Sequence, residues 1–239
     1  MNKGGVVLIL GSGPNAVQAA DWPRAWFDRV VVINNAWRVR PDWDDLVFPE
    51  DFPVDRRPGE IATVQHLIEA DAFVPAQNRF GGFVFAGATM AYTAAYWALD
   101  ALQPDVLAFM GCDMVYPKTG ATHFYGTGTA DPLRPDVSLR DLGAKSARLA
   151  LIAALQACAC VNLSQDTSSL VFERATASGL RDIAGPHAPN IADLRAREEA
   201  LGYATPSGHH AEFADKINVA VLDALDQEWR ERFSKSQTA

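Results

Sequence analysis

The chain has 239 residues, 49% of them hydrophobic, which suits a folded α/β domain rather than a solvated coil. It carries 29 acidic and 21 basic side chains, and the net charge of −8 argues against nucleic acid and anionic membranes as partners. No apolar run approaches the roughly 20 residues of a membrane span, and the N-terminus lacks a signal peptide, so we expect a cytoplasmic protein. The 3 cysteines have no zinc-site spacing and predict reduced thiols.

The first half of the chain alternates apolar runs with helical patterns. The runs at 6–10 and 30–33 are β-branched and continuous, which is typical of strands buried on both faces of a parallel sheet. At 60–70, apolar residues recur at helical spacing. In chain order the expected elements are strands at 6–10, 30–33 and 46–48, helices at 14–20 and 60–70, a strand at 83–85 and a helix at 87–102.

The second half opens with the clearest later strand, 106–110, which ends abruptly at Gly111-Cys112-Asp113. Residues 114–137 are rich in glycine and proline, and so long a loop is usually functional, so we expect it to close over a ligand and deliver His123. The remaining expected elements are a helix at 141–156, a last strand at 158–163 and helices at 191–201 and 211–233.

This alternation predicts a Rossmann-like α/β fold, a mostly parallel sheet with helices on both faces and a helical C-terminal extension. We assign residues 1–172 to a nucleotide-binding domain and 173–239 to a looser segment and C-terminal helices packed on it. In such folds the ligand lies outside the carboxyl ends of the strands. The candidate nucleotide-binding residues at or near those ends are Gly11, Ser12, Gly13, Pro14, Asn15, Asn34, Asn35, Gly87, Thr89 and Ser168.

Two of these groups have a chemical rationale. Gly11 and Gly13 would let the backbone approach a phosphate at a helix start, although a tight strand-to-helix turn explains them equally well. The run lacks the full G-x-G-x-x-G pattern and the lysine of a Walker loop, so NAD or ATP hydrolysis is weakly supported. Asn34 and Asn35 could read a nucleobase or sugar through their amides, or simply form a turn.

The segment after strand 106–110 holds the candidate catalytic residues Asp113, His123 and Tyr125. A histidine there could deprotonate an attacking hydroxyl near neutral pH, whereas a loop histidine can also be merely solvated. No metal site is predicted from these residues.

The ordered set of motifs resembles a known group of proteins. An apolar strand into Gly-x-Gly-Pro-Asn, a second strand ending in Asn34, a small-residue turn into a helix and a strand ending in Gly-x-Asp113 are similar to family-42 bacterial sialyltransferases. The pattern also resembles proteins grouped with archaeal 6-hydroxymethylpterin diphosphokinases and motility-associated glycosyltransferase-like proteins. The resemblance covers roughly residues 5–172, and the first motif has Ser12 where the sialyltransferases carry Asn.

The resemblance implies that residues 11–14 and Asn34 surround the nucleotide of an activated donor, with Asp113 shaping the site and His123 as the nearest base. The leading hypothesis is therefore a transferase that moves a sugar from a nucleotide donor to an acceptor hydroxyl, without a cofactor. A second is an ATP-dependent diphosphokinase acting on a small alcohol such as a pterin, with Mg²⁺ on Asp113 or Asp51. A third is a noncatalytic nucleotide- or glycan-binding protein, and whether the chain forms a homo-oligomer stays open.

Overall fold

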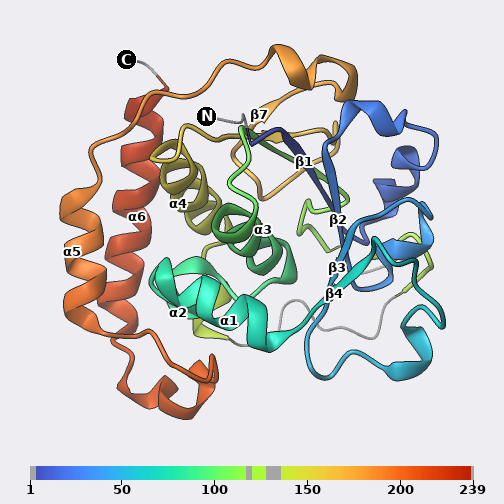
Figure 1. The fold of residues 1–239 in the computed structure, drawn as a ribbon. Helices are drawn as coiled ribbons and strands as arrows, with labels where there is room; N and C mark the ends of the chain where they lie inside the picture. The colour runs from blue at the N-terminus through green and yellow to red at the C-terminus, as the bar shows by residue number, and fades with distance from the viewer. Residues whose placement is uncertain (1–3, 117–119, 128–135, 238–239) are drawn as a thin grey trace.

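The computed structural model describes residues 4–116, 120–127 and 136–237, which form a parallel sheet flanked by helices (Figure 1). Within these residues the strand order is β4-β3-β2-β1-β5-β6-β7, and every pairing of neighbours is parallel. The strands are β1 (Val6–Leu10), β2 (Arg29–Ile33), β3 (Asp45–Val47), β4 (His66–Ile68), β5 (Val106–Met110), β6 (Ala159–Asn162) and β7 (Glu173–Arg174). The predicted Rossmann-like α/β class is confirmed.

Two kinds of helix connect the strands. The α-helices are α1 (Ala70–Arg79), α2 (Phe83–Ala86), α3 (Met90–Ala101), α4 (Leu142–Ala154), α5 (Ala192–Leu201) and α6 (Val219–Ser236). Short 3₁₀ helices are η1 (Pro14–Ala19), η2 (Arg24–Trp26), η3 (Asn34–Arg38), η4 (Val54–Arg56), η5 (Val137–Leu139), η6 (Ala177–Asp182) and η7 (His210–Lys216). In the described part of the chain, no helix has both the length and the apolar character that a bilayer crossing requires.

The sheet separates two apolar layers because successive side chains of a strand point to opposite faces. Val7 and Ile9 of β1 face a core that includes α1, α3, α4 and α6, whereas Leu8 and Leu10 face a second core closed by 3₁₀ segments. Both faces of the central strands are therefore buried, which explains why their sequences are continuously apolar.

Residues after 172 are joined to this sheet and its helices. β7 pairs with β6, and α5 and α6 lie side by side beyond α4 (Figure 1). Lys145 of α4 donates to Asp226 of α6 at 2.7 Å, and Arg148 of α4 donates to Glu198 of α5 at 2.7 and 2.8 Å. All four side chains are buried, so the C-terminal helices are held by charge as well as by apolar contact.

The helix predicted over 60–70 is wrong. β4 occupies His66–Ile68 and pairs with β3, and α1 begins only at Ala70. A turn precedes β4, in which the Gln65 amide nitrogen donates to the Ala62 carbonyl at 2.9 Å. Ile61, Val64 and Leu67, three of the apolar residues whose spacing indicates a helix, are 42%, 69% and 39% exposed. Pairing with β3 outweighs the helical spacing here.

The strand predicted at 83–85 is also wrong, because Phe83–Ala86 forms a single helical turn, α2. Gly82 and Gly87 flank it at φ angles of 85° and 87°, and these left-handed positions let the chain enter and leave so short a helix. A four-residue apolar run does not distinguish a strand from a buried helix.

Three further expectations need adjustment. Residues 158–163 do contain β6, but β7 follows it as the last strand. The long helix expected at 211–233 is divided into η7 and α6, because Asn218 caps the start of α6 by accepting from the Val221 amide at 3.3 Å. The expected closing loop, 114–137, falls partly outside the described residues, at 117–119 and 128–135.

Candidate functional site

The strand order contains a reversal that locates the crevice. From β1 the chain proceeds through β2 and β3 to β4 on one side, and β5, β6 and β7 follow on the other side of β1. β1 and β5 are neighbours, and their outgoing loops diverge at their carboxyl ends. This is a topological switch point, the usual ligand position in open α/β sheets.

A cavity of about 480 Å³ lies at this point. Most of the predicted site residues line it, namely Gly11, Ser12, Gly13, Pro14, Asn34, Thr89, Asp113 and His123. Those that do not line it are Asn15, Asn35, Gly87, Ser168 and Tyr125. Lining residues that the sequence did not single out include Met90, Gly111 and Cys112.

The glycines at the ends of β1 and β5 bring the two strand ends into contact. The amides of Gly11 and Gly13 donate to the carbonyls of Met110 and Gly111, each at 2.8 Å. A β-carbon on Gly13 would lie 2.9 Å from the Gly111 oxygen. These two N–H groups are thus already used, and in the described part of the chain the Ser12 amide between them has no protein acceptor. The amides of Gly11 and Gly13 therefore stabilise the contact between the two strand ends and are not free to bind a phosphate.

The N-terminus of α3 opens onto the cavity. Thr89 caps this helix by accepting from the Tyr92 amide at 3.3 Å, and Met90 and Ala91 also line the cavity. The amides of the first helical turn have no partner within a helix, and the helix dipole adds positive potential there. Gly87 shapes the preceding turn, since its φ is 87° and a β-carbon would lie 2.8 Å from the Tyr92 ring.

Asn34 directly follows β2 as the first residue of η3, and it also lines the cavity. Its φ of 52° is left-handed, a conformation that asparagine tolerates better than most residues. Its side-chain oxygen is buried with no hydrogen-bond partner among the described residues, and the same is true of Asn35, which lies outside the cavity. A buried acceptor without a donor is costly, so a ligand N–H or O–H would stabilise Asn34.

Two side-chain amides that do not line the cavity hold the Asp113 carboxylate in place. Asn15 donates to its Oδ2 at 2.7 Å and Asn162, at the end of β6, donates to its Oδ1 at 3.3 Å. Asn15 also contacts Asp166 at 2.9 Å, and Asn162 contacts Ser168 at 3.0 Å. Asn15 and Ser168 therefore support the site without lining it. Sequence reasoning missed Asn162, although it stands at the end of β6.

His123 belongs to a small hairpin that docks on the first motif. His123 and Gly126 exchange backbone hydrogen bonds of 3.0 Å, and the Phe124 amide donates to the Ser12 carbonyl at 3.1 Å. The Nδ1 atom of His123 lies 2.8 Å from the Thr122 hydroxyl, and the ring stacks on Tyr125 with centroids 5.0 Å apart. Burial lowers the pKa of His123, so the imidazole is neutral at pH 7.

The cavity also holds a phenol, Tyr116, and a thiol, Cys112. Burial raises the pKa of Tyr116 to about 12 and raises that of Cys112 further, so both stay protonated. Asp51 and Asp113 are its acidic residues, and none of its described lining residues is Lys or Arg. The described residues contain no cluster of three or more His, Cys, Asp or Glu side chains able to hold a metal ion.

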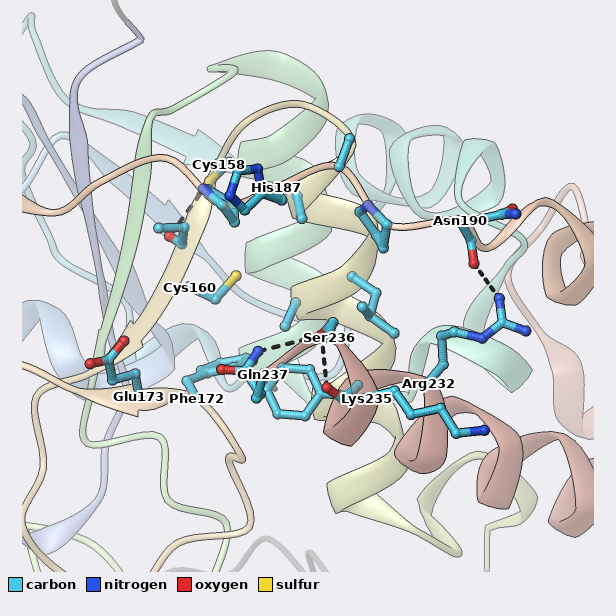
Figure 2. Close-up of a pocket in the computed structure, with 18 of the residues that line it drawn as sticks. Cys158, Cys160, Phe172, Glu173, His187, Asn190, Arg232, Lys235, Ser236 and Gln237 are labelled. Carbon is cyan, nitrogen blue, oxygen red and sulfur yellow. Dashed lines mark hydrogen bonds between the residues drawn. The ribbon is translucent and has the colours of Figure 1, made fainter. Parts of the chain in front are cut away.

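A larger cavity, of about 1070 Å³, lies away from the strand ends, between α4, β6, residues 183–193 and the end of α6 (Figure 2). Cys160 points into it, and burial raises the pKa of this thiol well above its usual range. Arg232 turns aside to bind the Asn190 carbonyl and Asp193 (Figure 2). The switch-point cavity is the better candidate because it lies at the carboxyl ends of the strands and beside the N-terminus of α3.

Comparisons with protein-family models, curated proteins and solved structures find no match. The chemistry of the site is therefore inferred from its own residues.

Proposed function

We propose that this chain is a transferase that binds a nucleotide-activated sugar in the switch-point cavity and moves the sugar to an acceptor hydroxyl. The observation that carries the proposal is that a neutral imidazole, His123, and the open N-terminus of α3 line the same cavity. The first is a general base near neutral pH, and the second is a site for a phosphate.

The strand order supports an orientation for the donor. The unpartnered oxygen of Asn34, beyond β2, suits an N–H of the nucleobase or a ribose hydroxyl. The Ser12 amide and the first turn of α3 would hold the phosphate. The sugar then lies toward the β5 side, where Asp113 and His123 line the cavity.

The charges of the cavity favour a donor with few phosphate charges. With no Lys or Arg among the described lining residues, one helix terminus and a few amides must balance the anion. One phosphate, as in a nucleoside monophosphate sugar, fits this inventory better than a triphosphate does.

In the transfer step, His123 Nε2 would accept the proton of the acceptor hydroxyl as its oxygen attacks the anomeric carbon. The bond between that carbon and the phosphate oxygen breaks, and the nucleotide leaves with the bonding electron pair. The amides at the α3 terminus stabilise the negative charge that grows on the leaving phosphate. The protonated Tyr116 hydroxyl in the same cavity is a further hydrogen-bond donor.

The diphosphokinase alternative is favoured by one observation, the presence of two carboxylates, Asp51 and Asp113, in a cavity without cationic side chains. Mg²⁺ bound by one or two carboxylates and by substrate phosphates would supply the missing positive charge. Dependence of binding on Mg²⁺ separates the two functions.

A thermal-shift screen with CMP, UMP, UDP, GDP, ADP, ATP and NAD, each with and without Mg²⁺, tests the proposal. At 100 times its Kd, a ligand stabilises the fold by about 2.7 kcal/mol, which raises Tm by about 5–10 °C for a chain of this size. We expect a nucleoside mono- or diphosphate to do so without Mg²⁺, and NAD not to.

Asn34→Gly is the matched site variant, because glycine keeps the φ of 52° and removes only the amide. It should abolish most of the nucleotide shift. The control is Asn218→Gly, at the exposed cap of α6, where glycine costs only a few tenths of a kcal/mol and the shift should persist. A shift with NAD alone, or with ATP only when Mg²⁺ is present, would contradict the transferase proposal.

A further inference from the structure

The imidazole of His123 contacts Thr122 through one ring nitrogen and Tyr125 through one ring face. Its Nδ1 edge meets the Thr122 hydroxyl at 2.8 Å, and one ring face stacks on Tyr125 at an interplanar angle of 23°. His123 itself lines the cavity, and no described residue forms a hydrogen bond with its Nε2. The ring is thus fixed by its Nδ1 edge and one face, and Nε2 is the nitrogen left for a ligand.

We infer that Thr122 is a positioning residue that selects the reactive tautomer of His123. This inference rests on the proposed role of His123 as base. A neutral imidazole carries one N–H, and Nε2 can accept a proton only if that hydrogen is on Nδ1. The Thr122 hydroxyl oxygen is within hydrogen-bond distance of Nδ1 and can accept from it.

The same contact supports the charged intermediate of the reaction. When Nε2 takes the acceptor proton, the positive charge spreads over both ring nitrogens, and Nδ1–H continues to donate to Thr122. A hydrogen bond from a charged donor is stronger than one between neutral groups. Thr122 therefore stabilises the imidazolium more than the neutral ring, which is the difference that lowers a barrier.

The backbone around Thr122 keeps this contact in place. The His123–Gly126 bridge closes the hairpin, and the Phe124 amide anchors it to Ser12 at the end of β1. Phe124 also packs against the core on that side of the sheet. The segment that carries the Thr122 hydroxyl and the His123 imidazole is thus held by the His123–Gly126 bridge and by the hydrogen bond from Phe124 to Ser12.

The test uses the full-length protein and three side chains at one position: Thr122, Thr122→Val and Thr122→Ser. Valine matches the shape of threonine without the hydroxyl, and serine keeps the hydroxyl. Long-range ¹⁵N–¹H NMR spectra of ¹⁵N-histidine-labelled protein, with His123 assigned by His123→Asn, report which ring nitrogen carries the hydrogen without requiring turnover.

We expect a protonated Nδ1 in the wild type and in Thr122→Ser, and a shift toward protonated Nε2 in Thr122→Val. Turnover of the donor should fall by about 10-fold or more in Thr122→Val and be restored by serine, while donor Kd stays unchanged. A wild-type spectrum with hydrogen on Nε2 would overturn the inference, as would a Thr122→Val spectrum identical to wild type. If no donor turns over, the proposed function fails while the spectra still decide the role of Thr122.

Discussion

Removing the carboxylate of Glu198 tests how the C-terminal helices are held. Glu198 is 2% exposed and accepts from Arg148 at 2.7 and 2.8 Å, from Arg195 at 2.8 Å and from Trp229 at 2.9 Å. Glu198→Gln keeps the shape and an acceptor but leaves the Arg148 guanidinium buried without its counter-charge. Breaking a buried pair in this way costs about 3–5 kcal/mol.

For a chain of 239 residues, a loss of this size lowers Tm by about 6–20 °C. The matched control is Glu228→Gln, whose pair with Arg197 is 40% and 47% exposed and is therefore expected to contribute about 0–1 kcal/mol. Urea unfolding, with the same m value required for each variant, gives the free energies of unfolding. A Glu198→Gln loss within about 1 kcal/mol of the control would refute the reasoning.

The pH dependence of the same variant gives an independent check. Burial alone would raise the pKa of Glu198, but the charge and hydrogen bonds of Arg148, with help from Arg195 and Trp229, lower it overall. Stability that depends on a depressed carboxyl pKa is present above the unfolded-state pKa and is lost as pH falls through the folded one. The difference between wild type and Glu198→Gln should therefore shrink below about pH 4.5.

Two changes at the switch point complete the predictions. Gly111→Ala should destabilise the fold by about 1–3 kcal/mol and weaken nucleotide binding, because φ is 69° and the new β-carbon would lie 2.7 Å from the Gly11 oxygen. Gly59→Ala, which meets nothing within 4 Å, is the control in the same thermal-shift assay, and equal Tm values would contradict the role of Gly111. His123→Asn should lower turnover by about 10²-fold or more with little change in donor Kd, and full turnover would eliminate His123 as the base.

The parts of the fold that the sequence predicts well are those fixed by burial. The runs at 6–10, 30–33 and 106–110 lie at the centre of the sheet, where both faces demand apolar side chains, and all three are strands. The predicted starts at 87 and 141 were also close to those of α3 and α4, which Thr89 and Asp141 cap. In these places the local pattern and the tertiary environment agree.

The errors fall where the local pattern is ambiguous and a distant partner decides. β4 is an edge strand with exposed side chains, so no burial pattern distinguishes it, and its pairing with β3 depends on residues about 20 positions earlier. α2 is four residues long, which is too short for a period to be measured. Neither outcome can be read from the segment alone.

In the candidate site too, the sequence predicts some features, whereas others depend on residues that are distant along the chain. Gly11, Asn34 and Asp113, selected because they follow strand ends, line one cavity, because parallel strands bring their carboxyl ends together. Position at a strand end did not separate lining residues from supporting ones. Asn15 directly follows Pro14, yet its amide turns to Asp113 and Ser164, because the segments after β5 and β6 present acceptors there.

The close approach of Gly11 and Gly111 links the fold to the proposed chemistry. The Phe124 amide donates to the Ser12 carbonyl at 3.1 Å, so the hairpin that carries His123 docks on the segment after β1, next to the contact between Gly11 and Gly111. The base and the Ser12 amide, one of the groups proposed to hold the phosphate, are therefore fixed to the same turn. A side chain at Gly111 would displace this turn and with it the base, which predicts that its effect on turnover exceeds its effect on donor affinity, since catalysis depends more steeply on geometry than binding does.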